Sequence, residues 1–451
     1  MPRYAIIVDP LSTGREYPAA FRAEGVLPIA VLSTPEPVDV LKDTWHPENF
    51  EVVIYHDGDL SEAAVQSLAS KLAEFDPLCI LPGAETGIRL YEALVPILLP
   101  GSGNVGALAD ARRDKWEMAK AIAAAGVPHL RQLFSADADE IAAWIADNDL
   151  TGSDLVVKPP NSGGTDDVHI VPAGTDEWRP LLARMTNDVN HLGLVNGGIL
   201  IQEFAAGNEF LVDSYSVDGK HGLVDVCRYT KVRKGDRIGI YDRVDFLTPD
   251  DEQTKTVWAY TLQVLDALGF RNGCGHAEVM LTPNGPRLIE IAERPAGGGH
   301  QYISKIATGS NHILRTVMHR VHGEYRPSYE LLQHLCGVFV SAPHAGIWRN
   351  AEIFDELEQL PTYVDRNFPK GTGDWVQSTD DLSSFLAWVT LVAPDEAAID
   401  LDYRRVKELE KQIVIDACAN PAVAANAAAD AGLADAESTD AESADAIEVN
   451  A

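Results

Sequence analysis

Glu278 and Glu290 have a spacing that suits a shared metal ion. They flank Thr-Pro-Asn-Gly, between two apolar-rich runs that predict a β-hairpin. For the two side chains to face each other, the turn must be centred on Asn284, which requires a loop of three or five residues with Gly285 in the left-handed conformation. An oxygen-preferring divalent cation such as Mg²⁺ removes the repulsion between paired carboxylates and leaves positions open for phosphate oxygens. The pair therefore indicates a metal site, with a solvated strand face and an incidental Glu–Arg pair as the alternative.

Alternation of side chains along the same hairpin predicts one charged and one apolar face. The charged face holds His276, Glu278, Glu290, Ala292 and Arg294, and the apolar face holds Val279, Ile289 and Ile291. His276 would lie beside Glu278, where it has either a functional role or the role of a satisfied structural histidine. After the hairpin, Gly297, Gly298 and Gly299 could present backbone N–H groups to a substrate carboxylate, although such turns are common without a ligand.

Two lysines lie where they could contact phosphate groups. Lys158 ends an apolar strand and precedes the loop Pro-Pro-Asn-Ser-Gly-Gly-Thr-Asp-Asp, whose backbone N–H groups could fold over phosphates. The residue order of a Walker loop is absent, and an ordinary turn beside a lysine is the alternative. Lys115 lies in the first turn of a helix expected over residues 111–125 with Asp110 as its N-cap, and there the alternative is a solvated helical charge.

Acceptors for a nucleoside are suggested by the run Ile-Leu-Ile-Gln-Glu-Phe-Ala-Ala-Gly-Asn-Glu-Phe. A strand leads into a short connection to which a flat base could hydrogen-bond, while Glu209 takes sugar hydroxyls; a plain surface loop is the alternative. Glu85 follows another strand-like run at the carboxyl end of an expected parallel sheet. Open α/β sheets bind ligands at that end, so Glu85 is a candidate for holding a substrate ammonium group.

Several packed units are needed to position these residues. Residues 1–100 alternate β-branched runs with amphipathic stretches, which predicts a parallel sheet covered by helices. From Asp154 onward strand-like segments dominate, with Asp218-Gly219 as a hairpin turn. Residues 327–415 form a smaller mixed segment. At 451 residues the chain is about three times as long as one typical domain, so a multidomain protein of α/β and α+β class is expected.

Composition and charge exclude several classes of protein. Hydrophobic residues make up 46% and charged residues 23%, which is ordinary globular usage, and a formal net charge of −32 disfavours binding to nucleic acids and anionic membranes. Neither a run long enough to span a bilayer nor a signal-peptide pattern is present, so a cytoplasmic protein is expected. The five cysteines form no Cys-x-x-Cys pair and are expected to be buried thiols. Residues 420–451, rich in alanine and acidic, are expected to form a disordered tail.

Taken in order, these pieces resemble the ATP-grasp superfamily over roughly residues 1–400. The pieces are Lys115, Lys158 with its glycine loop, Gln-Glu-Phe-Ala-Ala-Gly-Asn-Glu, His-Ala-Glu and Glu-Ile-Ala-Glu-Arg-Pro-Ala-Gly-Gly. Within the superfamily the chain is most similar to the L-amino-acid ligases that make dipeptides, including bacilysin-type synthetases. The resemblance implies an ATP-grasp fold with an N-terminal Rossmann-like domain over residues 1–105. A central domain over 106–205 and a C-terminal domain over 206–415, which includes the segment 327–415, would then grip ATP.

The resemblance also implies that three groups of residues contact ATP, its metal ion and the reacting groups. The group at the phosphates would be Lys115, Lys158, Ser162, Gly163 and Gly164. The group at the nucleoside would be Glu203, Phe204 and Ala205, around backbone contacts to adenine, with Glu209 at the ribose. The group at the reaction centre would be Glu278 and Glu290 with Mg²⁺ or Mn²⁺, and Arg294 at the transferring phosphoryl group.

Two positions depart from the broad pattern of the superfamily. Ala292 stands where many members carry Asn, which leaves the coordination of a second metal ion open, and Gln202 stands where many carry Glu. The implied reaction joins two L-amino acids into a dipeptide through an acylphosphate, with release of ADP and phosphate. The alternatives are an ATP-grasp enzyme that acts on bicarbonate or another carboxylate, and a non-catalytic ATP-binding sensor. The identity of the amino acids stays open, as does the oligomeric state, although many relatives are homodimers.

Overall fold

The N-terminal part of the chain is a parallel sheet with helices on both faces. The structure is a computed structural model that describes residues 2–164, 166–234, 237–380 and 384–420, so the expected tail lies outside it beyond Asn420. The strand order is β3-β2-β1-β4, and α2 and α3 cover one face while α1 covers the other. The elements are β1 (Arg3–Val8), α1 (Tyr17–Ala23), β2 (Val26–Leu32), β3 (Val52–Tyr55), α2 (Glu62–Ala73), β4 (Cys79–Pro82) and α3 (Ile88–Leu98). This is the Rossmann-like arrangement that the sequence predicts.

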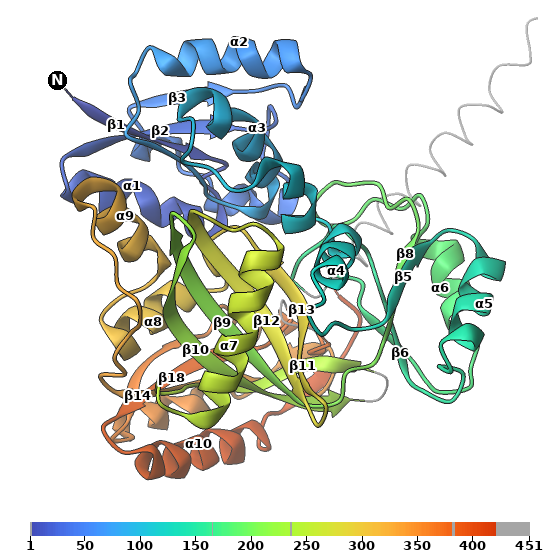
Figure 1. Cartoon of the computed structure of the whole chain (residues 1–451). Helices are drawn as coiled ribbons and strands as arrows, with labels where there is room; N and C mark the ends of the chain where they lie inside the picture. Colours follow the sequence, from blue (N-terminus) through green and yellow to red (C-terminus); the bar gives the residue numbers. More distant parts are fainter. Residues whose placement is uncertain (1, 165, 235–236, 381–383, 421–451) are drawn as a thin grey trace, which may run out of the picture.

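A second, antiparallel sheet follows, with the order β5-β8-β6-β7. Its apolar face packs against α5 and α6, and Figure 1 shows these elements set to one side of the larger sheet, with α4 between them. The elements are α4 (Lys115–Ala124), β5 (Gln132–Ser135), α5 (Ala138–Asp147), β6 (Leu155–Lys158), β7 (His169–Val171), α6 (Trp178–Met185) and β8 (Ile199–Glu203).

An eight-stranded antiparallel sheet, ordered β13-β12-β9-β10-β11-β14-β18-β16, forms the centre of the molecule. On β9, Phe210 and Val212 pack toward α7, while Leu211 on the opposite face packs toward α8. The elements are β9 (Asn208–Val217), β10 (Lys220–Lys234), β11 (Arg237–Phe246), α7 (Glu252–Ala267), β12 (Gly273–Thr282), β13 (Gly285–Ala292), α8 (His300–Thr308) and α9 (His312–His322).

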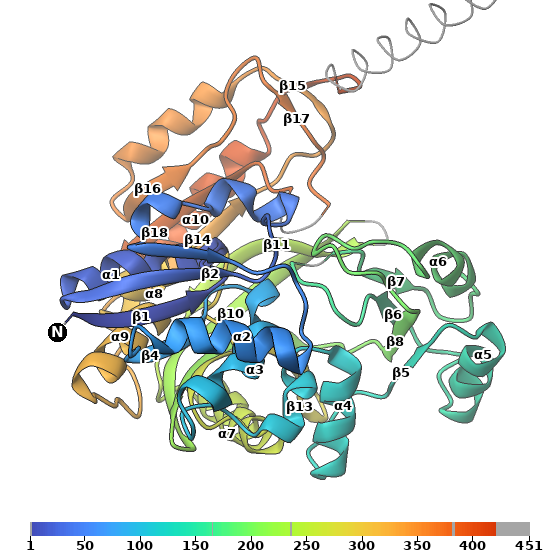
Figure 2. The same ribbon diagram turned by 90° about the horizontal axis from the view of Figure 1, so that it is seen from above.

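The segment after α9 completes this sheet. Its strands β14 and β18 extend the large sheet, and Figure 2 shows the segment on the side opposite α7. A small sheet ordered β17-β15-β19 lies beside it. The elements are β14 (His334–Val340), β15 (Gly346–Trp348), β16 (Tyr363–Asn367), β17 (Trp375–Val376), β18 (Ala387–Ala393), α10 (Glu396–Glu410) and β19 (Ile415–Ala417).

The hairpin of β12 and β13 corrects one prediction. Glu278 does lie opposite Glu290, but Thr282 pairs with Gly285, so the turn has two residues rather than three or five. The even turn is compatible with this pairing because a β-bulge shifts the register just after Glu278. The bulge also places Leu288, instead of Ile289, in the core.

Two smaller predictions are corrected as well. Asp110 lies in a short 3₁₀ turn and caps nothing; α4 begins at Lys115, and Asp114 is its N-cap. The Asp114 side chain accepts hydrogen bonds from the backbone N–H groups of Trp116 and Glu117. Four cysteines are buried and free as expected, whereas Cys418 is free but exposed.

Candidate active site

Three carboxylates meet on one face of the large sheet. Glu278 on β12 lies opposite Glu290 on β13, and Glu209 is near the start of the neighbouring strand β9. Burial, together with the negative charges of Glu290 and Glu209, raises the pKa of Glu278. One oxygen of Glu209 is buried without a hydrogen-bond partner, while the other lies 2.6 Å from Lys231 Nζ. Crowded carboxylate oxygens of this kind are suitable ligands for a hard divalent cation.

Both lysines predicted from the sequence reach this face. Lys115 Nζ lies 2.6 Å from Glu290 Oε2 and donates a hydrogen bond of 2.6 Å to the carbonyl oxygen of Ser162. Lys158, at the end of β6, is 4% exposed and donates to Gln202 Oε1 over 3.4 Å. Burial and the nearby charge of Lys115 lower the pKa of Lys158 to about 8. A buried ammonium group held only by a long hydrogen bond is ready to bind an anion such as a phosphate group.

Arg294 lies just beyond β13 and brings a permanent positive charge to the same place. Burial favours the neutral form of Glu290, but the charges of Lys115, Lys158 and Arg294 outweigh it and lower the Glu290 pKa. Arg294 Nε lies 2.7 Å from Glu85 Oε2, and Arg113 Nε lies 3.4 Å from Glu85 Oε1. Glu85 therefore holds two guanidinium groups, and this favours a role in positioning Arg294 over the expected role of binding a substrate ammonium group.

The glycine loop after β6 is tied to the start of α4. Asn161 Nδ2 donates to Asp114 Oδ2 over 2.5 Å, and Ser162 Oγ donates to Asp166 Oδ2 over 2.5 Å. Gly164 has a φ of +70°, which favours glycine, whereas Gly163 is surrounded by open space. The loop thus lies next to Lys115 and Lys158, as its predicted role at the phosphates requires.

Several groups in the connection between β8 and β9 already have hydrogen-bond or ion-pair partners within the protein. Glu203 pairs with Arg131 through a contact of 2.6 Å, and its backbone N–H donates to the Arg131 carbonyl oxygen. The N–H of Phe204 donates to the carbonyl oxygen of Asp154. Ala205 is half-buried.

A buried aspartate that the sequence analysis did not identify holds His276. Asp213 on β9 is fully buried, and its Oδ1 accepts a hydrogen bond of 2.7 Å from His276 Nδ1. His300 and His312 lie 3.5 and 3.3 Å from Asp213 Oδ2. A charged residue in the middle of an apolar strand, with the same strand parity as Glu209, is the signal that could have revealed Asp213.

The glycines after Arg294 join the hairpin to the N-terminal sheet. The carbonyl oxygen of Ala296 accepts a hydrogen bond of 2.8 Å from Thr13 Oγ1, and a side chain at Gly297 would approach Ser12. Gly298 has a φ of +62°. These contacts place Gly297 beside the segment that follows β1.

No helix within the described ranges is both long and apolar enough to cross a membrane. Residues 151–302 match the family model of the ATP-grasp domain. Dapdiamide A synthase from Enterobacter agglomerans is 28% identical over 418 residues, which are 90% of this chain and 95% of that protein.

Solved structures share the fold of nearly the whole chain. The L-amino acid ligase from Bacillus licheniformis superposes with a TM-score of 0.69 at 16% identity, over 92% of this chain and 99% of that one. The biotin carboxylase domain of the Hydrogenobacter thermophilus 2-oxoglutarate carboxylase, solved with ADP, magnesium and bicarbonate, has a TM-score of 0.59 at 14% identity, over 92% and 91%. Residues 151–302 thus carry an ATP-grasp domain, and over nearly its whole length the chain is similar to a dapdiamide A synthase and, in its fold, to an L-amino acid ligase.

Proposed function

We propose that this ligase uses ATP and Mg²⁺ to join the carboxylate of one L-amino acid to the amine of another. The observation that carries the proposal is the meeting of Glu278, Glu290 and Lys115 on one face, where Lys115 comes from a different part of the chain than the two glutamates. Such a face combines a site for a divalent cation with fixed positive charges for phosphate groups. The similarity to a dapdiamide synthase and to an L-amino acid ligase supports amide formation between amino acids.

The carboxylates fit a magnesium ion. Their oxygens are hard ligands, burial and then the charges of Glu290 and Glu209 raise the pKa of Glu278, and a Glu209 oxygen is buried without a partner. Glu278 and Glu290 would hold the ion, which would neutralise charge on the ATP phosphates when bound. Lys115 and Lys158 would bind the same phosphates, and the loop with Ser162, Gly163 and Gly164 would cover them.

The reaction needs two nucleophilic displacement steps, one at phosphorus and one at carbon. A carboxylate oxygen of the first amino acid attacks the γ-phosphorus of ATP, the bond to ADP breaks, and an acylphosphate forms. The neutral amine of the second amino acid then attacks the acyl carbon, phosphate leaves, and the amine nitrogen loses a proton. The planar guanidinium of Arg294, fixed by Glu85, would stabilise negative charge in both steps.

His276 is proposed to contact the reacting substrates. Its Nδ1 is occupied by Asp213, which fixes the ring and leaves the second nitrogen for a substrate group. Gly297 and Gly298 are proposed to offer backbone N–H groups to a substrate carboxylate, and Glu203, Phe204, Ala205 and Glu209 to line the nucleoside. We also propose domain boundaries near residues 105 and 205, and a homodimeric state.

The test is phosphate release from ATP and Mg²⁺ across all pairs of the common L-amino acids, with mass spectrometry of the products. A dipeptide mass together with phosphate for particular pairs supports the ligase. Bicarbonate is included as an acceptor because the biotin carboxylase domain shares the fold. Phosphate release that requires bicarbonate and no amine would favour the carboxylase alternative, and ATP binding without any turnover would favour the sensor.

A further inference from the structure

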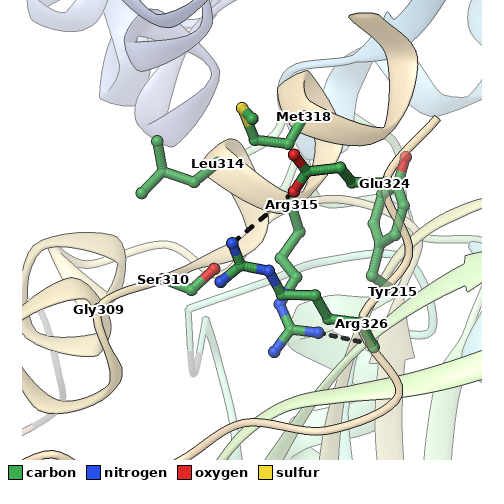
Figure 3. A pocket seen from close by; sticks show the side chains of 8 residues that line it. All are labelled: Tyr215, Gly309, Ser310, Leu314, Arg315, Met318, Glu324 and Arg326. Carbon is green, nitrogen blue, oxygen red and sulfur yellow. Dashed lines mark hydrogen bonds and ion pairs between the residues drawn. The ribbon is translucent and has the colours of Figure 1, made fainter. Parts of the chain in front are cut away.

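A cavity lies away from the carboxylates and lysines. Its volume is about 160 Å³, and it opens between α9, the residues just before it, the far end of β9 and the loop after α9 (Figure 3). The lining residues are Tyr215, Gly309, Ser310, Leu314, Arg315, Met318, Glu324 and Arg326. Tyr215 is six residues beyond Glu209 on β9, and at about 3.3 Å per residue this separates the cavity from Glu209 by about 20 Å.

Arg315 makes this cavity chemically unusual. Its side chain is 6% exposed, and its two terminal nitrogens donate to the carbonyl oxygens of Arg326 and Ser328 over 2.7 and 2.9 Å. Its Nε is buried without a hydrogen-bond partner, and no carboxylate of the described residues lies within ion-pair distance of it. Burial and the nearby charge of Arg326 lower the pKa of Arg315 to about 10. A buried guanidinium without a counter-ion is costly, and an anion in the adjoining cavity would remove that cost.

The rest of the lining indicates what kind of anion fits. Leu314 and Met318 supply apolar surface. Glu324 lies 3.7 Å from Arg326 at the rim and would repel a second negative charge on a ligand. We propose that this cavity binds a small organic monocarboxylate whose short apolar body lies against Leu314 and Met318, with its carboxylate at Arg315.

The cavity is held open by contacts that do not involve a ligand. The N–H of Leu223 on β10 donates to the carbonyl oxygen of Pro327 over 3.0 Å, and a side chain at Gly222 would come within 2.3 Å of the carbonyl oxygen of Arg326. Arg315 fixes the same loop from the other side. The loop after α9 is therefore already fixed against β10 and α9 before any ligand binds. Little conformational entropy of the loop is lost on binding.

The test is isothermal titration of the full chain with isovalerate, with isovaleramide as the uncharged analogue and inorganic phosphate as the competing anion. We expect isovalerate to bind and isovaleramide to bind at least about tenfold more weakly, because the amide lacks the charge that Arg315 compensates. Arg315→Met should abolish isovalerate binding. Because Arg315 also anchors the loop, Leu314→Trp serves as a second variant that fills the cavity and keeps the guanidinium.

Controls separate this cavity from the candidate active site. Arg294→Gln should bind isovalerate as the unaltered chain does, whereas a loss in that variant would place the ligand at the active site and overturn the proposal. Equal affinities in the unaltered chain and in Leu314→Trp would overturn it as well. So would the absence of isovalerate binding, or tighter binding of phosphate than of isovalerate. L-Valine is titrated in parallel into Arg294→Gln, and tighter binding than isovalerate would identify the monocarboxylate as an amino acid.

Discussion

Glu290 is the residue at which the opposing charges of the candidate site meet. It faces Glu278 and contacts Lys115, so Glu290→Gln should remove both a proposed metal ligand and a negative charge. We expect ATP turnover to fall at least about 10²-fold, the scale seen when one group that stabilises transferring charge is lost. The free energy of unfolding should stay near its starting value because repulsion from Glu278 is relieved. Phosphate release and thermal unfolding measure the two effects.

Glu330→Gln is the matched control, since Glu330 is an exposed carboxylate outside the site. Its turnover should equal that of the unaltered chain. Full turnover in Glu290→Gln would contradict the metal assignment, whereas loss of the folded state in that variant would show that the Lys115 ion pair is chiefly structural.

Glu85 contacts Arg294, which we propose to act at the reacting groups, so the replacement of Glu85 should affect rate more than binding. In Glu85→Gln the two guanidinium groups of Arg113 and Arg294 lose their shared counter-charge. We expect kcat to fall by about 10- to 100-fold, as when a residue that orients a functional group is replaced. The KM for ATP should change little because the lysines are untouched. An unchanged kcat would show that Arg294 needs no support from Glu85.

At the scale of elements, the cap of α4 links helix stability to the glycine loop. Asp114 caps the helix with one oxygen and accepts from Asn161 with the other. Asp114→Ala should lower the free energy of unfolding by about 1 kcal/mol and raise the KM for ATP several-fold, because the loop loses its anchor. Asp137→Ala removes the equivalent cap of α5 and should have the same cost in stability with no change in KM. Equal KM values in both variants would contradict the link.

His300 on helix α8 contacts Asp213 on β9 and Asp225 on β10. Burial favours the neutral form of His300, but Asp225 and Asp213 raise its pKa to about 9 from an ordinary value of 6.5. Because the folded-state pKa is the higher one, this stabilisation is complete below about pH 6.5 and is lost as the pH rises through 9. Its size is about 3 kcal/mol. Unfolding of the chain and of His300→Gln, measured from pH 6 to 9.5, should show stabilities that converge with rising pH. A constant difference would contradict the charged state.

The elements also show how far the sequence could predict the structure. That Glu278 and Glu290 face each other was predictable, because side chains alternate along a strand with a period of two. The bulge that accommodates the two-residue turn has no recognisable pattern in the local sequence. Asp110 and Asp114 are equally good caps by residue type, and the choice between them follows from the tertiary contact of Asp114 with Asn161. The same limit explains why the two arginine partners of Glu85, which come from distant segments, were not foreseen.

At the scale of the whole molecule, the segment after Asn420 is separable from the predicted site. All candidate site residues lie between Glu85 and Arg294 or in the glycines that follow, and residues 421–451 contribute seven acidic and no basic residues. Their bulky apolar residues are Val423, Leu433, Ile447 and Val449. A chain ending at Asn420 should keep its kcat, KM and unfolding midpoint, as measured by phosphate release and calorimetry.

The truncated chain also tests whether the negative charge of this segment has a role. Truncation reduces the formal net charge from −32 to −25, and self-repulsion in the folded state should not increase as a result. A full-length chain with the seven acids replaced by Asn and Gln separates charge from length. If activity falls in the truncated chain but not in this variant, the segment packs on the enzyme through uncharged contacts. If it falls in both, the negative charge itself supports activity. Unchanged activity in both is the expected result, since the ion pairs of Lys115 with Glu290 and of Arg294 with Glu85 lie within residues 85–294.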